Sequence, residues 1–491
     1  MSVHRLPENP NLEHLRRLAR SLQRRVRAGD ADAVALAHEH HPRVPAPAQF
    51  TRSDALLVIA RRYGFPSWPR LHAHVSTVAG HSRSPHRAAP SGRVDRFLSL
   101  ACLTYGADAS GRLAAARRML DEDAGLAAAT IHTAAATGAV ATLRDMLAAD
   151  PSLANTLGGP HRWPPLLYLA FARITEGARG HAPLEAAEVL LDAGADPAAG
   201  YLWSGLTPPF TAVTGALGMG EDAVNQPPHP DGFALARRLF AAGADANDAQ
   251  ALYNRRSSPD NAHLDLLLSH GLGRGDGGVW HARLAPAHPS PQQIVEEELR
   301  WSAAMSRADR VRMLLAVVDD VDGLGDRHPL LADRTACEHA ALLGDAITVE
   351  LLVRAGARRP QPGALDLLRG ACLSGDRDAV ERLVSQDATL PGRLIAREPT
   401  LIDRAAELGR TGAVPILAGL GFDLSPTDRP TPLHVAAFAG HLEVVRALVA
   451  AGADPYRREP GFDATALEWA QHNQQHEVAV WLAERMEPAR E

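Results

Sequence analysis

Residues Thr431–Ala436, which read TPLHVA, and Leu448–Pro455, which read LVAAGADP, decide the fold of this chain. The hydroxyl of Thr431 suits a helix N-cap, and Pro432 suits the first helical position because its φ is already helical and its missing N–H is not needed there. A first helix is expected to end near Gly440 and a second at Gly452, since glycine readily adopts the left-handed conformation of a C-cap. The stretch therefore predicts two short helices joined by a tight turn.

The same unit recurs with a period near 33 residues. The Gly-Ala-Asp turn returns at residues 194–196 and 243–245, and the glycines expected between paired helices are spaced 31 to 34 residues apart: Gly344, Gly375, Gly409 and Gly440. A fixed period with two helices per unit is typical of stacked repeats, in which each unit buries its apolar face against its neighbours.

On these residues the chain resembles the ankyrin-repeat family. The Thr-Pro-Leu-His-x-Ala run, the Gly-Ala-Asp-Pro turn and the period all match, with degenerate copies at Ala129–Ala134 and Arg334–Ala340. The resemblance covers residues 93–491, or about ten to eleven units on the ankyrin period. It implies an all-α ankyrin solenoid with a concave groove, in which the motif histidines, His132 and His434, make structural hydrogen bonds.

Five segments are expected along the chain. Residues 1–78 are interpreted as an N-terminal helical cap, similar to the segment ahead of some bacterial ankyrin arrays, that covers the open end of the first repeat. The others are a linker at 79–92, ankyrin repeats at 93–160, irregular repeats with long loop insertions at 161–330, and regular repeats with a C-terminal cap at 331–491. Insertions are placed at 175–183, 200–208 and 217–231, and a Gly- and Pro-rich loop is predicted over 271–291.

Composition restricts the chemistry. All 51 basic residues are arginine, against 57 acidic residues, and the chain of 491 residues contains no lysine. This excludes a lysine Schiff base and a phosphate-binding P-loop lysine. A net charge of −6 argues against a nucleic-acid-binding protein. The arginines are expected at surface positions, as a GC-rich coding bias would produce.

Signals for secretion and for a membrane are missing from the sequence. Residues 1–11 are polar, and no stretch approaches the roughly 18 apolar residues that a membrane span needs. Three widely spaced cysteines, Cys102, Cys337 and Cys372, indicate a reducing compartment. These observations predict a cytoplasmic protein.

No cofactor or metal site is predicted. The histidines at 38–41 and 472–476 lack metal-ligand geometry, and the Gly-x-Gly-x-x-Gly match at 273–278 has neither a strand before it nor a helix after it. The arginine run at 16–27 is interpreted as a solvated helix face, because no aromatic residue interleaves it for base stacking.

Most of the scarce aromatic residues fall where the repeat is irregular. Because Ala and Leu suffice to pack a regular repeat, these aromatics indicate either a ligand pocket or loops packed over an irregular seam. The predicted binding residues are Trp203, Phe210, Tyr253, Asn254, Arg255, Trp280 and Trp301. For a catalytic pocket, the acid–base candidates are His229, Glu338 and Asp248.

Two functions stay open at this point. The first is an interaction scaffold that binds a protein partner in its concave groove, an inference that rests on family analogy. The alternative is an enzyme or small-molecule-binding protein, in specialised metabolism for example, with an aromatic, His-lined pocket in the middle repeats. No catalytic motif is recognisable, so the sequence favours the scaffold and leaves its partner and oligomeric state open.

Overall fold

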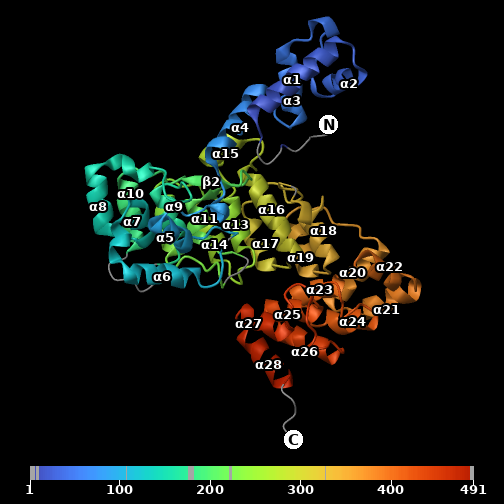
Figure 1. Cartoon of the computed structure of the whole chain (residues 1–491). Helices are drawn as coiled ribbons and strands as arrows, with labels where there is room; N and C mark the ends of the chain where they lie inside the picture. The colour runs from blue at the N-terminus through green and yellow to red at the C-terminus, as the bar shows by residue number, and fades with distance from the viewer. Residues whose placement is uncertain are drawn as a thin grey trace. The chain divides into compact units, whose positions relative to one another are not determined.

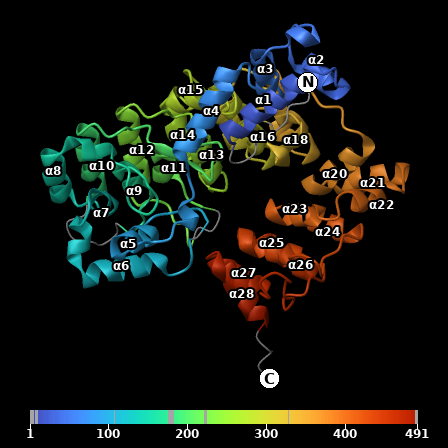
Figure 2. The same ribbon diagram turned by 45° about the horizontal axis from the view of Figure 1, so that its top comes forward.

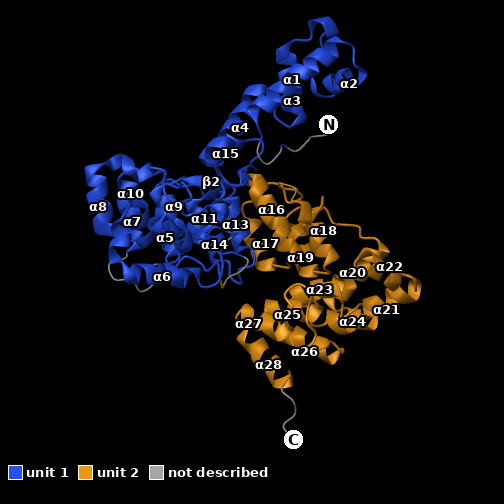
Figure 3. Ribbon diagram, in the orientation of Figure 1, with its two compact units in different colours: residues 1–221, 225–291 blue, residues 222–224, 292–491 orange. Residues whose placement is uncertain are grey.

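The computed structural model describes residues 6, 10–106, 108–174, 182–220, 224–326 and 328–486. The chain divides into two compact units, which Figure 3 colours separately. Unit 1 comprises residues 1–221 and 225–291, and unit 2 comprises residues 222–224 and 292–491. Within the described ranges, no helix combines the length and apolar character needed to cross a membrane.

The N-terminal segment of unit 1 forms a helical bundle with its own core. The side chain of Asn11 caps the first helix by accepting hydrogen bonds from the backbone N–H groups of Glu13 and His14. Leu15, Ala19, Leu22 and Val26 of this helix are buried in that core. The elements are α1 (Leu12–Arg27), α2 (Ala31–His40), the 3-10 helix η1 (Pro47–Gln49), α3 (Arg52–Arg62) and α4 (Trp68–His81).

The bundle joins the irregular repeats, whereas we expected it to cover the first repeat. Helix α4 runs past the expected boundary at residue 78 and packs against α15 (Gly278–Leu284) (Figure 1). The expected linker contains β1 (Ser82–Arg83) and the 3-10 helix η2 (Pro85–Arg87). Strand β1 pairs in parallel with β2 (Gly200–Trp203), and β2 pairs antiparallel with β3 (Phe210–Thr211).

Helix α15 forms where the sequence predicted a loop. Trp280 and Leu284 of this helix are buried with Val78 and Leu202 in one apolar cluster. Burying two large apolar side chains stabilises the helix by more than the neighbouring glycines disfavour it. Tertiary packing therefore overrides local propensity here.

The expected insertions are only partly described. Residues 200–208 form β2 and the turn that follows it. Most of 175–183 and part of 217–231 lie outside the described residues.

Five antiparallel helix pairs form the described repeats of unit 1. Their first helices α7, α9, α11 and α13 lie side by side in two views of the chain (Figure 1), (Figure 2). Every residue of α7 and α9 is buried, so the core lies along this row. The elements are α5 (Arg93–Ala101), α6 (Arg112–Glu122), η3 (Ala124–Ala128), α7 (Ile131–Thr137), α8 (Val140–Ala149), η4 (Pro151–Asn155), α9 (Pro165–Phe171), α10 (Pro183–Asp192), α11 (Ala212–Leu217), α12 (Gly232–Ala241), α13 (Ala249–Arg255) and α14 (Ala262–Ser269).

Six further helix pairs and one additional helix, α22, form the described part of unit 2. A continuous apolar core runs from α20 to α28. The elements are α16 (Pro291–Ala304), α17 (Ala308–Leu314), η5 (Pro329–Leu331), α18 (Ala336–Leu342), α19 (Ala346–Arg354), α20 (Ala364–Ser374), α21 (Arg377–Gln386), α22 (Leu390–Arg397), α23 (Leu401–Glu407), α24 (Ala413–Gly419), α25 (Pro432–Ala439), α26 (Leu442–Ala450), α27 (Ala466–His472) and α28 (His476–Met486).

The predicted local signals are confirmed at α25. Thr431 caps this helix in a capping box with His434, and the helix ends at Gly440, whose φ is 79°. The Nε2–H group of His434 donates to the carbonyl oxygen of Ala464 at 3.0 Å, which ties α25 to the loop before α27. His132 makes the corresponding bond to the carbonyl oxygen of Thr156 at 2.9 Å. Both histidines are therefore structural.

Candidate functional site

Four of the seven predicted binding residues line one cavity of about 460 Å³ in unit 1, which we call the aromatic pocket. Trp203 comes from β2, Phe210 from β3, and Tyr253 and Asn254 from α13. The other lining residues are Tyr105, Leu206, Thr207, Pro208, Met219, Gly220, Gln226, Gln250 and Ser257. The volume falls within the range of small-molecule sites.

The rings of the pocket rest on a buried aromatic layer. Trp203 donates from its Nε1–H group to the carbonyl oxygen of Thr104 at 3.0 Å and stacks on His86, with ring centroids 4.3 Å apart. Phe210 stacks on Tyr201 at 5.5 Å, and Tyr201 packs against Trp163 at 4.9 Å. Tyr201 and Trp163 are buried behind Phe210, while Trp203 and Phe210 line the pocket.

Tyr105 is a pocket residue that sequence reasoning missed. It has a φ of 56°, in the left-handed region, and its backbone N–H donates to a carboxylate oxygen of Asp108 at 2.7 Å. The amide of Gln226 donates to the same oxygen at 2.9 Å, which brings a second pocket residue into place. Burial raises the pKa of Tyr105 to about 12, so its hydroxyl stays protonated at neutral pH. The sequence signal that could have identified Tyr105 is the Gly-Ala-Asp motif at residues 106–108, which directly follows it.

The pocket offers hydrogen bonds but no charge. The side-chain amide of Gln250 donates to Oδ1 of Asn254 at 2.8 Å. Tyr253 is 42% exposed at the pocket, and the guanidinium of Arg256 lies 5.1 Å from its ring centroid. None of the described lining residues has an ionisable acid, histidine or arginine side chain. The lining presents aromatic faces together with hydroxyl and amide groups, an arrangement that suits a neutral planar ligand.

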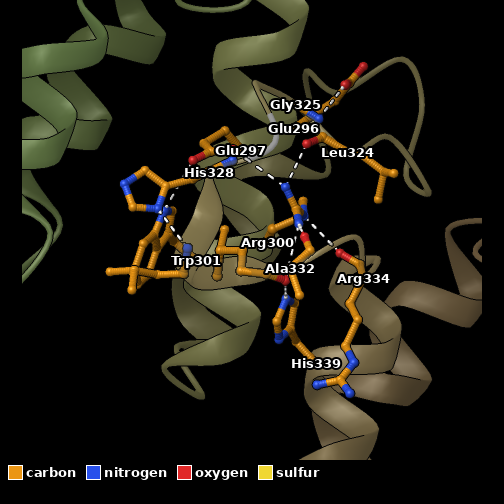
Figure 4. Close-up of polar contacts among 12 residues, drawn as sticks. Glu296, Glu297, Arg300, Trp301, Leu324, Gly325, His328, Ala332, Arg334 and His339 are labelled. Atoms are coloured by element: carbon orange, nitrogen blue, oxygen red, sulfur yellow. Dashed lines mark hydrogen bonds and ion pairs between the residues drawn. The ribbon is translucent and has the colours of Figure 1, made fainter. Parts of the chain in front are cut away.

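Arg255, Trp280 and Trp301 lie outside this pocket. Arg255 donates from Nε to the carbonyl oxygen of Leu217 at 2.6 Å and thereby braces α11. Trp280 donates from Nε1 to the carbonyl oxygen of Ala198 at 2.9 Å and belongs to the cluster with α4. Trp301 is in unit 2, where its Nε1–H group donates to Glu297 at 3.3 Å (Figure 4).

None of the three acid–base candidates lines the aromatic pocket, and two of them, Asp248 and Glu338, take part in helix caps. Asp248 caps α13 and accepts hydrogen bonds from Thr211 at 2.5 Å and from Thr214 at 2.9 Å. Burial, followed by repulsion from Arg173, lowers the pKa of His229 to about 3, so this side chain stays neutral. Glu338, in unit 2, forms a capping box with Thr335.

Arginines are not confined to the surface, contrary to our expectation. Arg300 of α16 has no exposed surface and donates to four backbone carbonyls (Figure 4). Its Nε donates to Arg334 at 2.8 Å, Nη1 donates to Leu324 at 2.6 Å, and Nη2 donates to Leu331 at 3.3 Å and to Ala332. A guanidinium has five N–H donors in a rigid fork, which an ammonium cannot replace at such a site.

The described residues contain no group of three or more His, Cys, Asp and Glu side chains arranged to hold a metal ion.

Comparison with known families identifies the C-terminal repeats. A model described as ankyrin repeats, in three copies, matches residues 368–490, which extend from α20 through α28. No curated protein matches the chain. The match establishes residues 368–490 as ankyrin repeats, and the mostly helical, paired architecture of the other described residues is consistent with an all-α ankyrin solenoid.

Proposed function

We propose that the protein binds a protein partner through its C-terminal ankyrin repeats, at the connection between α26 and α27. The observation that carries this proposal is the exposure of Phe462, at 83%. Tyr456 on the same connection is 56% exposed. Aromatic residues make up only 5% of the chain, so exposed rings on one loop are not a by-product of composition. Exposed aromatic side chains are typical binding hot spots.

The connection holds the backbone at Phe462 in a fixed position. Arg458 and Thr465 form a β-bridge, and the N–H group of Glu459 donates to the carbonyl oxygen of Ala464 at 3.0 Å. The carboxylate of Glu459 accepts from the backbone N–H groups of Gly461 and Phe462, each at 2.6 Å. A preorganised loop loses little conformational entropy when a partner binds, so more of the contact energy contributes to affinity.

Side chains of α23 and of the turn after it are hydrogen-bonded within unit 2. Arg404 donates from Nη2 to the carbonyl oxygen of Ala304 at 2.5 Å, and Arg410 donates to the hydroxyl of Ser306 at 2.5 Å. These bonds join α23 and the turn after it to the end of α16 and the turn that follows α16. A partner that bound against these side chains would have to break these hydrogen bonds, which favours the exposed loop as the binding surface.

Phe462→Ala is expected to raise the Kd for the partner about 30-fold, which corresponds to ~2 kcal/mol for an aromatic hot spot. The melting temperature should stay unchanged, because the ring is 83% exposed and contributes little to folding. The full chain is immobilised and exposed to extract from its own source cells, and the captured protein is then titrated calorimetrically against the wild type and the variant.

Val480→Ala is the matched control, since Val480 is 59% exposed on α28. The proposal requires a protein that the wild type and the Val480→Ala variant capture equally and the Phe462→Ala variant does not. Equal capture by all three, or no captured protein with the wild type, would contradict it.

A second candidate function is the binding of a neutral, planar small molecule in the aromatic pocket. Its support is the uncharged lining of Tyr105, Trp203, Phe210 and Asn254 around a cavity of about 460 Å³. A panel of neutral aromatic metabolites is expected to contain a compound that raises the melting temperature of the wild type.

Tyr253→Ala should abolish most of that thermal shift, because Tyr253 lines the pocket, while Tyr456→Ala should leave it intact. Both side chains are partly exposed, at 42% and 56%, so neither substitution should unfold the chain. A panel without any stabilising compound, or equal losses in the two variants, would count against this function.

A further inference from the structure

Three arginines of unit 1 line a second cavity of about 290 Å³, which we call the arginine pocket. They come from segments that are distant in the sequence: Arg83 is in β1, Arg162 precedes α9, and Arg283 is in α15. Leu157 and Trp280 add apolar surface to the lining.

Two of the guanidinium groups are held in place by the protein. Arg83 donates from Nη1 to the carbonyl oxygens of Gly80 at 2.9 Å and Ser82 at 2.7 Å, and from Nε to that of Arg162 at 3.3 Å. In the described part of the chain its Nη2 has no hydrogen-bond partner. The guanidinium of Arg283 lies 5.2 Å from the ring centroid of Trp280. These donors are therefore positioned before a ligand arrives.

The pocket concentrates positive charge. Burial, followed by repulsion from Arg162, lowers the pKa of Arg83. Burial also lowers the pKa of His81, with further contributions from Arg283 and Arg83. Asp196 is the one acidic side chain among the described lining residues, and one of its oxygens already accepts from the N–H group of Ala198 at 2.9 Å.

None of the three arginines forms an ion pair with a described carboxylate, unlike Arg112 with Asp108 or Arg144 with Glu185. These arginines without ion pairs occur in a chain of net charge −6, so the positive charge of the pocket does not reflect a generally basic protein. Like charges gathered in a concavity raise the local concentration of an anion.

We propose that the arginine pocket binds a small molecule that carries a phosphate group. Nη2 of Arg83 can donate to one phosphate oxygen, and the forks of Arg162 and Arg283 match phosphate oxygens in a bidentate manner. A phosphate presents enough oxygens and charge for these three groups. The indole of Trp280 would contact the remainder of the molecule. A cavity of about 290 Å³ admits a small ligand and not a nucleic-acid duplex. The site is in unit 1 and does not depend on partner binding at Phe462.

Isothermal titration of the full chain with pyrophosphate, at constant ionic strength, tests the proposal. The wild type should bind one equivalent, more tightly than it binds acetate. Arg283→Ala and Arg162→Gln should each weaken binding about tenfold, because each removes one charged donor. Arg144→Ala removes the same charge from an exposed ion pair on α8 and should change the Kd less than about twofold.

The Arg162 side chain is exposed and makes no hydrogen bond to another described residue, so Arg162→Gln should preserve the melting temperature and keep the test interpretable. Pyrophosphate binding no tighter than that of acetate would overturn the proposal. An equal loss of pyrophosphate affinity in Arg144→Ala would overturn it as well, because the effect would then come from the net charge of the protein and not from the pocket. Displacement of pyrophosphate by a DNA duplex would assign the surface to nucleic acid instead.

Discussion

Arg300→Leu is expected to lower the free energy of unfolding of unit 2 by about 4 kcal/mol, the cost typical of removing one partner from a buried charged network. The reason is that the carbonyls of Leu324, Leu331, Ala332 and Arg334 would lose their charged donor, while leucine offers none in return. Hydrogen exchange of the amides in α16 and α18 measures this change directly, because core amides report the opening free energy.

Arg334→Ala is the control, since Arg334 contributes only its carbonyl oxygen to this network (Figure 4). Its own side chain is exposed, and its removal should change the free energy of unfolding by less than about 0.5 kcal/mol. Arg300→Lys should recover only part of the loss, because one ammonium cannot reach all four carbonyls. A loss below about 1 kcal/mol in Arg300→Leu would show that water replaces the guanidinium at little cost.

Arg173→Leu is expected to have a comparable effect on unit 1, again of about 4 kcal/mol. Arg173 is 3% exposed and donates to the carbonyl oxygens of Gly215 at 2.8 Å, Gly218 at 3.0 Å and Pro227 at 2.8 Å. It donates as well to two carbonyls at the end of α9. Burial lowers its pKa to about 10, which still leaves it charged at neutral pH.

The substitution should also disturb the aromatic pocket, because Pro227 directly follows the pocket residue Gln226. We expect loss of amide protection in α9 and α11 together with faster proteolytic cleavage near residue 227. Arg144→Ala, at an exposed ion pair, should leave both unchanged. Faster cleavage near residue 227 without loss of amide protection in α9 and α11 would contradict this prediction. It would mean that Arg173 orders only the loop that contains Pro227.

Sequence reasoning succeeded where the signals are local. The cap Thr431, the proline after it and the C-cap Gly440 act within one helix, so the sequence alone predicts α25. It failed for α15, which depends on burial of Trp280 against Val78, a residue about 200 positions away. Likewise, the position of the N-terminal bundle follows from the pairing of β1 with β2, and no local pattern predicts that pairing.

The pocket residues show the same division. Trp203, Phe210 and Tyr253 are predicted because they belong to the scarce aromatic residues of the irregular repeats, which regular repeats do not need for packing. Tyr105 was missed because the stacking of repeats brings it to Phe210 from a segment about 100 residues earlier, with ring centroids 5.3 Å apart. Trp301 is among the predicted binding residues because it lies close in sequence to the irregular repeats. The structure places it in unit 2, where its ring centroid lies 5.4 Å from that of His328.

Site-specific photo-crosslinking tests the central proposal, partner binding at the loop before α27, most directly. A photoreactive phenylalanine analogue is placed at Phe462 in the full chain and, in a second protein, at Val480, and both are irradiated in extract from the source cells. We predict a discrete crosslinked protein at Phe462 that is missing at Val480. No crosslink at Phe462, or the same pattern at both positions, would contradict the account.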